Sequence, residues 1–263
     1  MGDERSRTRH NAAAMWVKGR ARFWGWAAVA VACVALVACG GGEGDDDGGG
    51  EESGPPDVAV LLDSAVGQFL EMQSFHFALD FDGETSPMEQ LSVDMETIEG
   101  DVILPDQLDA KVKAKARQFG GINVNVSLVG VGEDAWVTNP FDQTMWLPLE
   151  GGNPLNGLFN PSEGVAAVIR GAANPTLTGE EEIDGVLTWV VEGTIDSGDL
   201  TAFLDSAVPG YDVKGTIWIG KDDNVIYRIY LLGQLTAEEP VDILRRLSFS
   251  SFNDVEPIEP PLP

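Results

Sequence analysis

Cysteine, histidine and basic residues are all scarce in this chain of 263 residues. It has two Cys, two His and 16 Lys and Arg, against 43 Asp and Glu, for a formal net charge of −27. Both cysteines, Cys33 and Cys39, lie near the N-terminus, so the remainder of the chain cannot form a disulfide. Structural zinc sites draw on Cys and His, and hydrolytic triads need an imidazole. The composition therefore argues against a disulfide scaffold, a metal site and a triad enzyme.

The charge balance also restricts the partners. After residue 38 the chain holds ten Lys and Arg against 41 Asp and Glu. Affinity for nucleic acid comes largely from cations that neutralise phosphates, so we expect no nucleic-acid partner. Electrostatic attachment to anionic lipids is disfavoured for the same reason. His76 is the only imidazole after this point, and no G-x-S-x-G, H-E-x-x-H or P-loop motif is present.

The first 38 residues have the layout of a secretory signal. Six Lys and Arg are followed by an uncharged apolar run from Phe23 to Ala38. Leu36-Val37-Ala38-Cys39 then places a Cys directly after small residues. This sequence resembles the lipobox of bacterial lipoproteins, in which the Cys is fatty-acylated and becomes the N-terminus once the signal is removed. We expect residues 1–38 to be a signal peptide and Cys39 to be lipid-modified, with palmitate as one of its acyl groups.

An alternative is an uncleaved transmembrane helix with a chance cysteine. The apolar run is about 16 residues long, below the roughly 17–25 that a spanning helix needs. The sequence that follows is acidic, whereas basic residues usually follow a stop-transfer helix. Gly40 to Pro56 reads GGGEGDDDGGGEESGPP, and glycine with like charges is typical of a flexible, extended tether. We interpret residues 39–56 as the lipidated Cys and its tether.

Residues 57–263 are predicted to fold as one domain. From Asp57 to Met72 apolar residues recur at spacings of three and four, which predicts an amphipathic helix with Asp57 as its N-cap. The period then changes to two, which predicts strands. Segments 154–171 and 199–208 return to helix-like spacing.

The strands are joined by links of hairpin length, and Asp184-Gly185 is a strong turn signal. Roughly ten strands with three or four helices predict an α+β fold, in which one antiparallel sheet packs with a few helices. The expected strands cover 75–81, 93–104, 108–119, 124–128, 135–138, 145–147, 176–183, 186–195, 213–219, 225–235 and 243–252.

One predicted strand carries the only basic patch. In 108–119 the side chains of Lys111, Lys113, Lys115 and Arg117 share one face. This ladder either meets an anionic headgroup or pairs with the acidic surface around it, and the sequence leaves both open.

Several short motifs occur in the order found in one lipoprotein family. They are Ser74-Phe75-His76-Phe77, Ile98-Glu99-Gly100-Asp101-Val102, GEDAWVTNP at 132–140 with Trp146, 183–193, 215–219 and 247–260. Together with the lipobox, the tether and the leading helix, they make the chain resemble the LppX/LprA/LprF/LprG lipoproteins of actinobacteria and their relatives. The resemblance spans about residues 57–260.

The resemblance implies a fold and a function. The fold is a single curved antiparallel half-barrel sheet whose concave face is covered by a few helices, similar to the periplasmic lipoprotein carriers. The function is to bind acylated lipids or glycolipids in an apolar cavity and carry them across the cell envelope, without catalysis, cofactor or metal. The implied location is the cell membrane, on its outer face, with Cys39 as the anchor and a membrane lipid exporter as a further partner.

The same resemblance gives candidate cavity residues. Segments 154–171 and 199–208 are the candidate lids over the cavity, and their apolar faces would line it, although sequence cannot separate lining from ordinary core. The residues are Leu155, Leu158, Phe159, Val165, Val168, Ile169, Leu200, Phe203 and Leu204.

Two other functions compete with a lipid carrier. A surface interaction or sensor lipoprotein would have a solid core and no lipid cargo. A glycosidase would need two carboxylates at a defined separation in a cleft, and no such pair stands out. Co-purifying lipid would favour the carrier, whereas a stable protein partner would favour the interaction lipoprotein.

Overall fold

The computed structural model describes residues 54–82, 86–88, 93–150, 152–153, 164–201 and 207–261. They belong to a compact unit that runs from Glu52 to Pro263. Its core residues, from Leu61 to Phe249, form one hydrophobic cluster. The segment from Glu52 onward therefore contains a complete hydrophobic core of its own.

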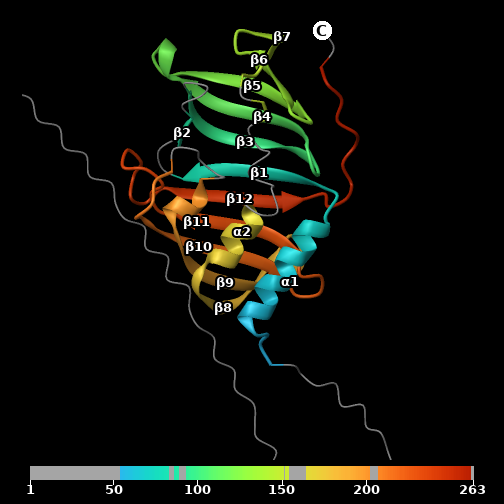
Figure 1. The fold of residues 1–263 in the computed structure, drawn as a ribbon, viewed down its shortest axis with the longest axis vertical. Helices are drawn as coiled ribbons and strands as arrows, with labels where there is room; N and C mark the ends of the chain where they lie inside the picture. Colours follow the sequence, from blue (N-terminus) through green and yellow to red (C-terminus); the bar gives the residue numbers. More distant parts are fainter. Residues whose placement is uncertain are drawn as a thin grey trace, which may run out of the picture. The chain divides into compact units, whose positions relative to one another are not determined.

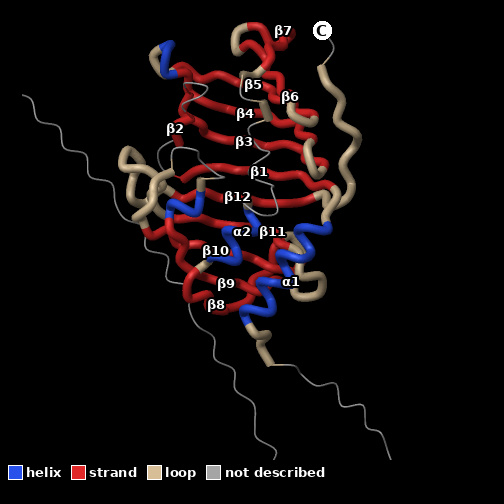
Figure 2. The backbone as a smooth tube through the Cα atoms, viewed as in Figure 1, coloured by secondary structure: helices blue, strands red, loops and turns tan. Residues whose placement is uncertain are grey.

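The unit is built on one antiparallel sheet (Figures 1 and 2). Its strands are β1 (Ser74–Asp82), β2 (Ser86–Met88), β3 (Val93–Ile103), β4 (Gln107–Ala116), β5 (Ile122–Val131), β6 (Asp134–Asn139), β7 (Asp142–Pro148), β8 (Ala173–Ile183), β9 (Val186–Asp196), β10 (Asp212–Gly220), β11 (Ile226–Leu232) and β12 (Leu244–Ser250). The order across the sheet is β7-β6-β5-β4-β3-β1-β12-β11-β10-β9-β8, and β2 pairs with β3 beside this path. The sheet is open, with β7 and β8 at its two edges.

The two faces of the sheet differ because side chains alternate along each strand. On the inner face, apolar residues stand opposite one another from strand to strand. One row reads Val126, Val112, Ile98, Leu79, Leu247, Ile229, Ile217, Val191 and Leu177. The outer face is polar, and there Lys111 stands between Glu99 and Ser127. The alternating pattern in the sequence thus separates an apolar face from a charged one.

Helix α1 (Val58–Glu71) covers part of the inner face. It begins at Asp57, whose carboxylate Oδ1 accepts hydrogen bonds from the backbone N–H groups of Ala59 and Val60, at 2.9 and 3.2 Å. Its Phe69 ring lies 5.8 Å from the Phe75 ring on β1 and 6.0 Å from the Phe249 ring on β12. Three phenyl rings from the helix and two neighbouring strands therefore fill the centre of the core.

Helix α2 (Val165–Gly171) packs against α1 and against the 3-10 helix η3 (Ser197–Leu200). Helix α1 also contacts β8. In Figures 1 and 2 both α-helices lie over the half of the sheet that runs from β12 to β8. Among the described helices, none is long and apolar enough to cross a membrane.

The structure confirms an α+β fold with one open antiparallel sheet and corrects several details. All eleven expected strands form, and the sheet has a twelfth, the short β2, which carries no alternating pattern. The strand predicted over 108–119 ends at Ala116, and Arg117–Phe119 form the 3-10 helix η2. The paired glycines Gly120 and Gly121, with φ of 76° and 78°, turn the chain there.

The two predicted lid segments are described only in part. Helix α2 supplies the second half of 154–171, and η3 supplies the start of 199–208. The stretches 154–163 and 202–206 lie outside the described residues.

Candidate functional site

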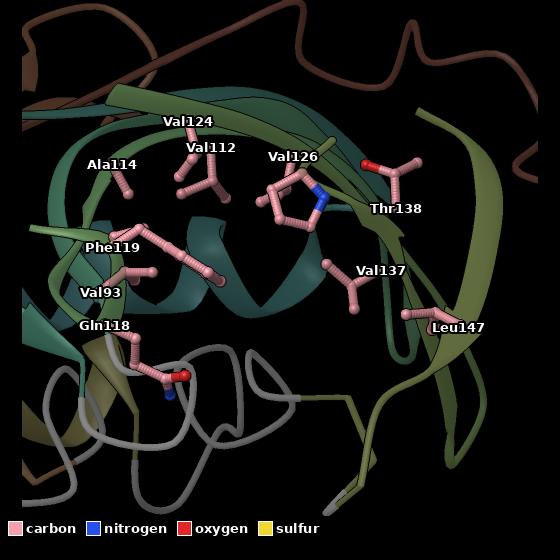
Figure 3. Close-up of a pocket in the computed structure, with 12 residues that line it drawn as sticks. Val93, Val112, Ala114, Gln118, Phe119, Val124, Val126, Val137, Thr138 and Leu147 are labelled. Atoms are coloured by element: carbon pink, nitrogen blue, oxygen red, sulfur yellow. The ribbon is translucent and has the colours of Figure 1, made fainter. Parts of the chain in front are cut away.

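An apolar groove opens on the inner face of the sheet, over strands β3 to β7 (Figure 3). Its volume is about 180 Å³. The lining residues are Val93, Val112, Ala114, Ala116, Gln118, Phe119, Val124, Val126, Val137, Thr138, Pro140 and Leu147. The groove thus lies on the opposite half of the sheet from the one that the helices cover.

Side-chain size explains why the groove lies over these strands. On β1 the inner face carries Phe75 and Phe77, which are buried and fill the space beneath α1. On β4 the inner positions that line the groove are Val112, Ala114 and Ala116. Alanine and valine are too short to fill the depth of the layer, and interiors otherwise pack without large voids. The backbones of these strands therefore remain paired without a break, while a hollow lies above them on the inner face.

Two turns close one end of the groove. Helix η2 supplies Gln118 and Phe119, and the β6–β7 turn supplies Pro140 and the neighbouring Phe141. The Phe119 and Phe141 rings meet edge to face, with centroids 5.1 Å apart and an interplanar angle of 87°. Both remain exposed, at 54% and 64%. We call these two residues the aromatic rim.

Local hydrogen bonds fix the turn that carries Phe141. The backbone N–H of Phe141 donates to Asn139 Oδ1 at 2.8 Å, as in an Asx turn. The hydroxyl and the backbone N–H of Thr144 donate to Asp142 Oδ1, at 2.6 and 3.1 Å. These two hydrogen bonds lower the pKa of Asp142, because they stabilise its ionised carboxylate.

The groove carries no charge of its own. None of its twelve lining residues is ionisable, and only Gln118 and Thr138 have polar side chains. The hydroxyl oxygen of Thr138 already accepts a hydrogen bond from the backbone N–H of Ser127, at 2.8 Å. Such a lining favours hydrocarbon through burial and gives no acid, base or nucleophile for a reaction.

Of the nine predicted cavity residues, the four that the structure describes lie away from the groove. Val165, Val168 and Ile169 on α2 and Leu200 on η3 are 0–5% exposed and belong to the hydrophobic core. None of these four lines the groove. Cys39, Leu155, Leu158, Phe159, Phe203 and Leu204 lie outside the described residues.

Sequence reasoning assigned β4 and β5 to an apolar face but did not recognise them as a site. The signal was available in the residue types. The inner positions along the groove on these strands are Val112, Ala114, Val124 and Val126, whereas β1 carries Phe75 and Phe77 on its inner face. A run of small apolar residues on the inner face indicates where a sheet is under-filled.

Charged groups outside the groove are paired in ways that indicate structural roles. His76 Nδ1 lies 2.7 Å from Asp101 Oδ1 on the outer face. Arg245 is 4% exposed, and its Nη2 lies 2.5 Å from Glu239 Oε1 in an ionic contact, while its Nη1 donates to the carbonyl of Gly233 at 2.8 Å. In the part of the chain that is described, no group of three or more His, Cys, Asp or Glu is arranged to hold a metal.

Comparison with known proteins places the chain in a family. The fold is similar to LprF from Mycobacterium bovis (17% identity, TM-score 0.61, covering 79% of this chain and 98% of that one). It is also similar to the Mycobacterium tuberculosis lipoprotein LppX (20% identity, TM-score 0.55, covering 77% and 98%). No curated protein matches the sequence. The family model of the LppX_LprAFG lipoproteins matches residues 57–243, so the chain belongs to the LppX_LprAFG lipoprotein family.

Proposed function

We propose that this chain is a membrane-anchored lipoprotein that binds acyl chains of lipids or glycolipids on the inner face of its sheet and carries them across the cell envelope. The observation that carries this proposal is the uncharged groove over β3–β7, in a protein with a net charge of −27. Family membership supports the proposal, and so does the lipobox-like sequence at Cys39.

The size of the groove sets how much lipid it holds. An apolar cavity of about 150 Å³ stays dry and binds benzene, so a groove of about 180 Å³ holds a similar number of carbon atoms. Each buried methylene contributes about 0.8 kcal/mol. The groove therefore suits one segment of an acyl chain, and a lipid with several long chains needs further apolar space.

That further space would come from the helices. Val165, Val168 and Ile169 on α2 and Leu200 on η3 pack onto the core, and they would line an extension of the groove if these elements moved away from the sheet. The predicted residues Leu155, Leu158, Phe159, Phe203 and Leu204 would join them. We propose this as the route by which long chains are accommodated.

Anchoring would follow from Cys39. In the proposed mature protein, residues 1–38 are removed, acyl groups on Cys39 hold the chain to the outer face of the cell membrane, and residues 39–56 tether the domain. Two acyl chains suffice for stable anchoring, whereas one gives only reversible binding. A membrane lipid exporter is the proposed source or recipient of the cargo.

Native mass spectrometry tests the function directly. Residues 52–263, which contain their own core, would be purified without detergent and measured before and after extraction with organic solvent. We expect near one-to-one occupancy by extractable lipid, lost on extraction and restored by added lipid. A bare mass that also refuses added lipid would refute the carrier and favour the alternative of an interaction or sensor lipoprotein with a solid core.

A further inference from the structure

The aromatic rim exposes apolar surface to solvent in addition to the part that lines the groove. Phe119 lines the groove, yet more than half of its surface faces solvent, and Phe141 is exposed beyond it. On the adjoining strands Ile122 and Met145 are also exposed, at 45% and 48%. The two phenyl rings touch each other at the tips of two separate turns and form a compact apolar point at the end of the groove.

The sequence around the rim departs from the acidity of the rest of the chain. From Ala110 to Gly132 there is no Asp or Glu, and all four charged side chains are cations. From Ala135 to Leu149 the only acid is Asp142. The chain as a whole has 43 Asp and Glu. Because acidic residues are nearly absent from these two segments, an anionic surface would meet little electrostatic repulsion at the rim.

Two of the four cations beside the rim are engaged in ion pairs and two are not. Lys115 Nζ lies 2.9 Å from Glu96 Oε1, and Arg117 Nε lies 3.5 Å from Asp94 Oδ1. Among the described residues Lys111 and Lys113 form no ion pair; Lys113 stands between Thr97 and Asn125, and Lys111 stands between Glu99 and Ser127. The outer face of β4 therefore carries two lysines outside any ion pair of the described residues, on the strand that leads to the rim.

We propose that the aromatic rim is the surface by which the domain docks on a lipid bilayer, with Phe119 and Phe141 inserted among the acyl chains and Lys111 and Lys113 near the headgroups. This inference rests on the proposed function and identifies the end of the groove through which the lipid would enter. Phe119 belongs to both the rim and the groove lining. When the rim is inserted in the bilayer, the groove therefore opens directly to the acyl chains of the membrane, and a lipid tail can enter it without crossing water.

The geometry favours a bilayer over a protein partner. A stable protein interface buries about 800 Å² on each side and needs 20–30 residues, whereas the rim consists of two rings with two exposed neighbours. Aromatic residues at a membrane surface act individually, and flanking Lys residues extend to the headgroups. The small, pointed rim with nearby cations has the features of such a contact.

Vesicle flotation tests the proposal with residues 52–263, which lack the lipidated Cys. The vesicles are phosphatidylcholine, with and without phosphatidylglycerol. We expect the native sequence to bind, and Phe119→Ser with Phe141→Ser to weaken partitioning by roughly tenfold for each ring. The matched control is Leu187→Ser with Val241→Ser, at positions 46% and 75% exposed and outside the rim, which we expect to bind as the native sequence does. Lys111→Gln with Lys113→Gln is expected to remove most of the additional binding to phosphatidylglycerol.

A second measurement reports the depth of insertion. Residues 52–263 contain no cysteine, so Phe141→Cys can carry a single polarity-sensitive dye, with Val241→Cys as its control. A blue shift on vesicles at position 141 but not at 241 supports the proposal. Equal shifts at the two positions, equal flotation of the rim variant and the native sequence, or no flotation of the native sequence would each overturn it.

The outcomes also distinguish a failure of the docking proposal from a failure of the proposed lipid binding. If the rim variant keeps its lipid in native mass spectrometry and loses flotation, both proposals stand. If the native sequence floats and carries no lipid, docking stands and the proposed function fails. If the rim variant loses its lipid and still floats, the rim belongs to the groove alone and the docking proposal is refuted.

Discussion

Filling the groove with a side chain is the sharpest test of where the cargo binds. Ala114 lies on the floor of the groove on β4 and points into it (Figure 3). A phenyl ring has the size of benzene, for which a cavity of about 150 Å³ suffices, so Ala114→Phe would occupy most of the roughly 180 Å³. The ring would displace the acyl segment while leaving the backbone pairing of β4 with β3 and β5 intact.

The magnitude follows from the hydrocarbon that the ring excludes. At about 0.8 kcal/mol per methylene, losing four to six methylenes costs about 3–5 kcal/mol, a decrease in affinity of two to three orders of magnitude. Ala114→Leu, which adds less volume, is expected to give an intermediate loss. The assay is titration of the delipidated protein with a fluorescent fatty acid, with thermal unfolding measured on the same samples.

The matched control is Lys113→Phe, on the same strand but on the outer face between Thr97 and Asn125. We expect it to bind fatty acid with the native affinity. If Ala114→Phe folds and also retains the native affinity, the groove over β3–β7 is not the binding site and the argument from side-chain size is wrong.

Three further predictions concern the stability of the scaffold. Arg245→Met leaves the carboxylate of Glu239 buried without its cation, so we expect a loss of about 3–5 kcal/mol in urea unfolding, largely recovered by adding Glu239→Gln; an unchanged midpoint for the single variant would contradict this. Burial raises the pKa of the Asp109 carboxyl, with Asp101 adding to the shift and Lys111 opposing it. The folded state therefore holds this proton more tightly than the unfolded state does, and stability falls as pH rises from the ordinary value of 3.8 through the raised pKa. Asp109→Asn removes that loss, so its gain over the native sequence in thermal unfolding is expected to grow toward neutral pH and to stay below about 0.5 kcal/mol, because solvent still screens this partly buried group. Asp57→Ala removes the cap of α1 and is expected to cost about 1 kcal/mol, whereas Asp57→Ser is expected to keep most of it.

Periodicity predicted the elements well because it depends on neighbours along the chain. The helix predicted over 57–72 forms at Val58–Glu71, and the strands around Phe75, Val112 and Val124 form where alternation places them. The strand predicted over 108–119 ends three residues earlier, at Ala116, because two glycines with positive φ follow and the chain turns through η2. The turn at the two glycines ended the strand there, although the alternation of basic and apolar side chains continues as far as Arg117.

The groove could not be located by the same means. Periodicity tells which face of a sheet a side chain occupies, but not how far away the opposing layer lies. The prediction of lining residues therefore rested on the helical segments, where Val168 and Leu200 pack in the hydrophobic core. What sets the position of the groove is the small size of Val112, Ala114 and Ala116 on β4, together with which strands α1 covers, and periodicity specifies neither of these.

Two halves of one sheet thus have different physical roles. The half beneath α1 obtains its stability from packing, with Phe69, Phe75 and Phe249 in mutual contact. The half around β4 lacks such filling, yet its backbone is paired on both sides along ten positions. Backbone hydrogen bonds do not depend on what fills the space above the strands, so vacancy there costs dispersion contacts but not the fold. A carrier needs this division, because a space that filled itself would hold no lipid and a space without a rigid frame would collapse.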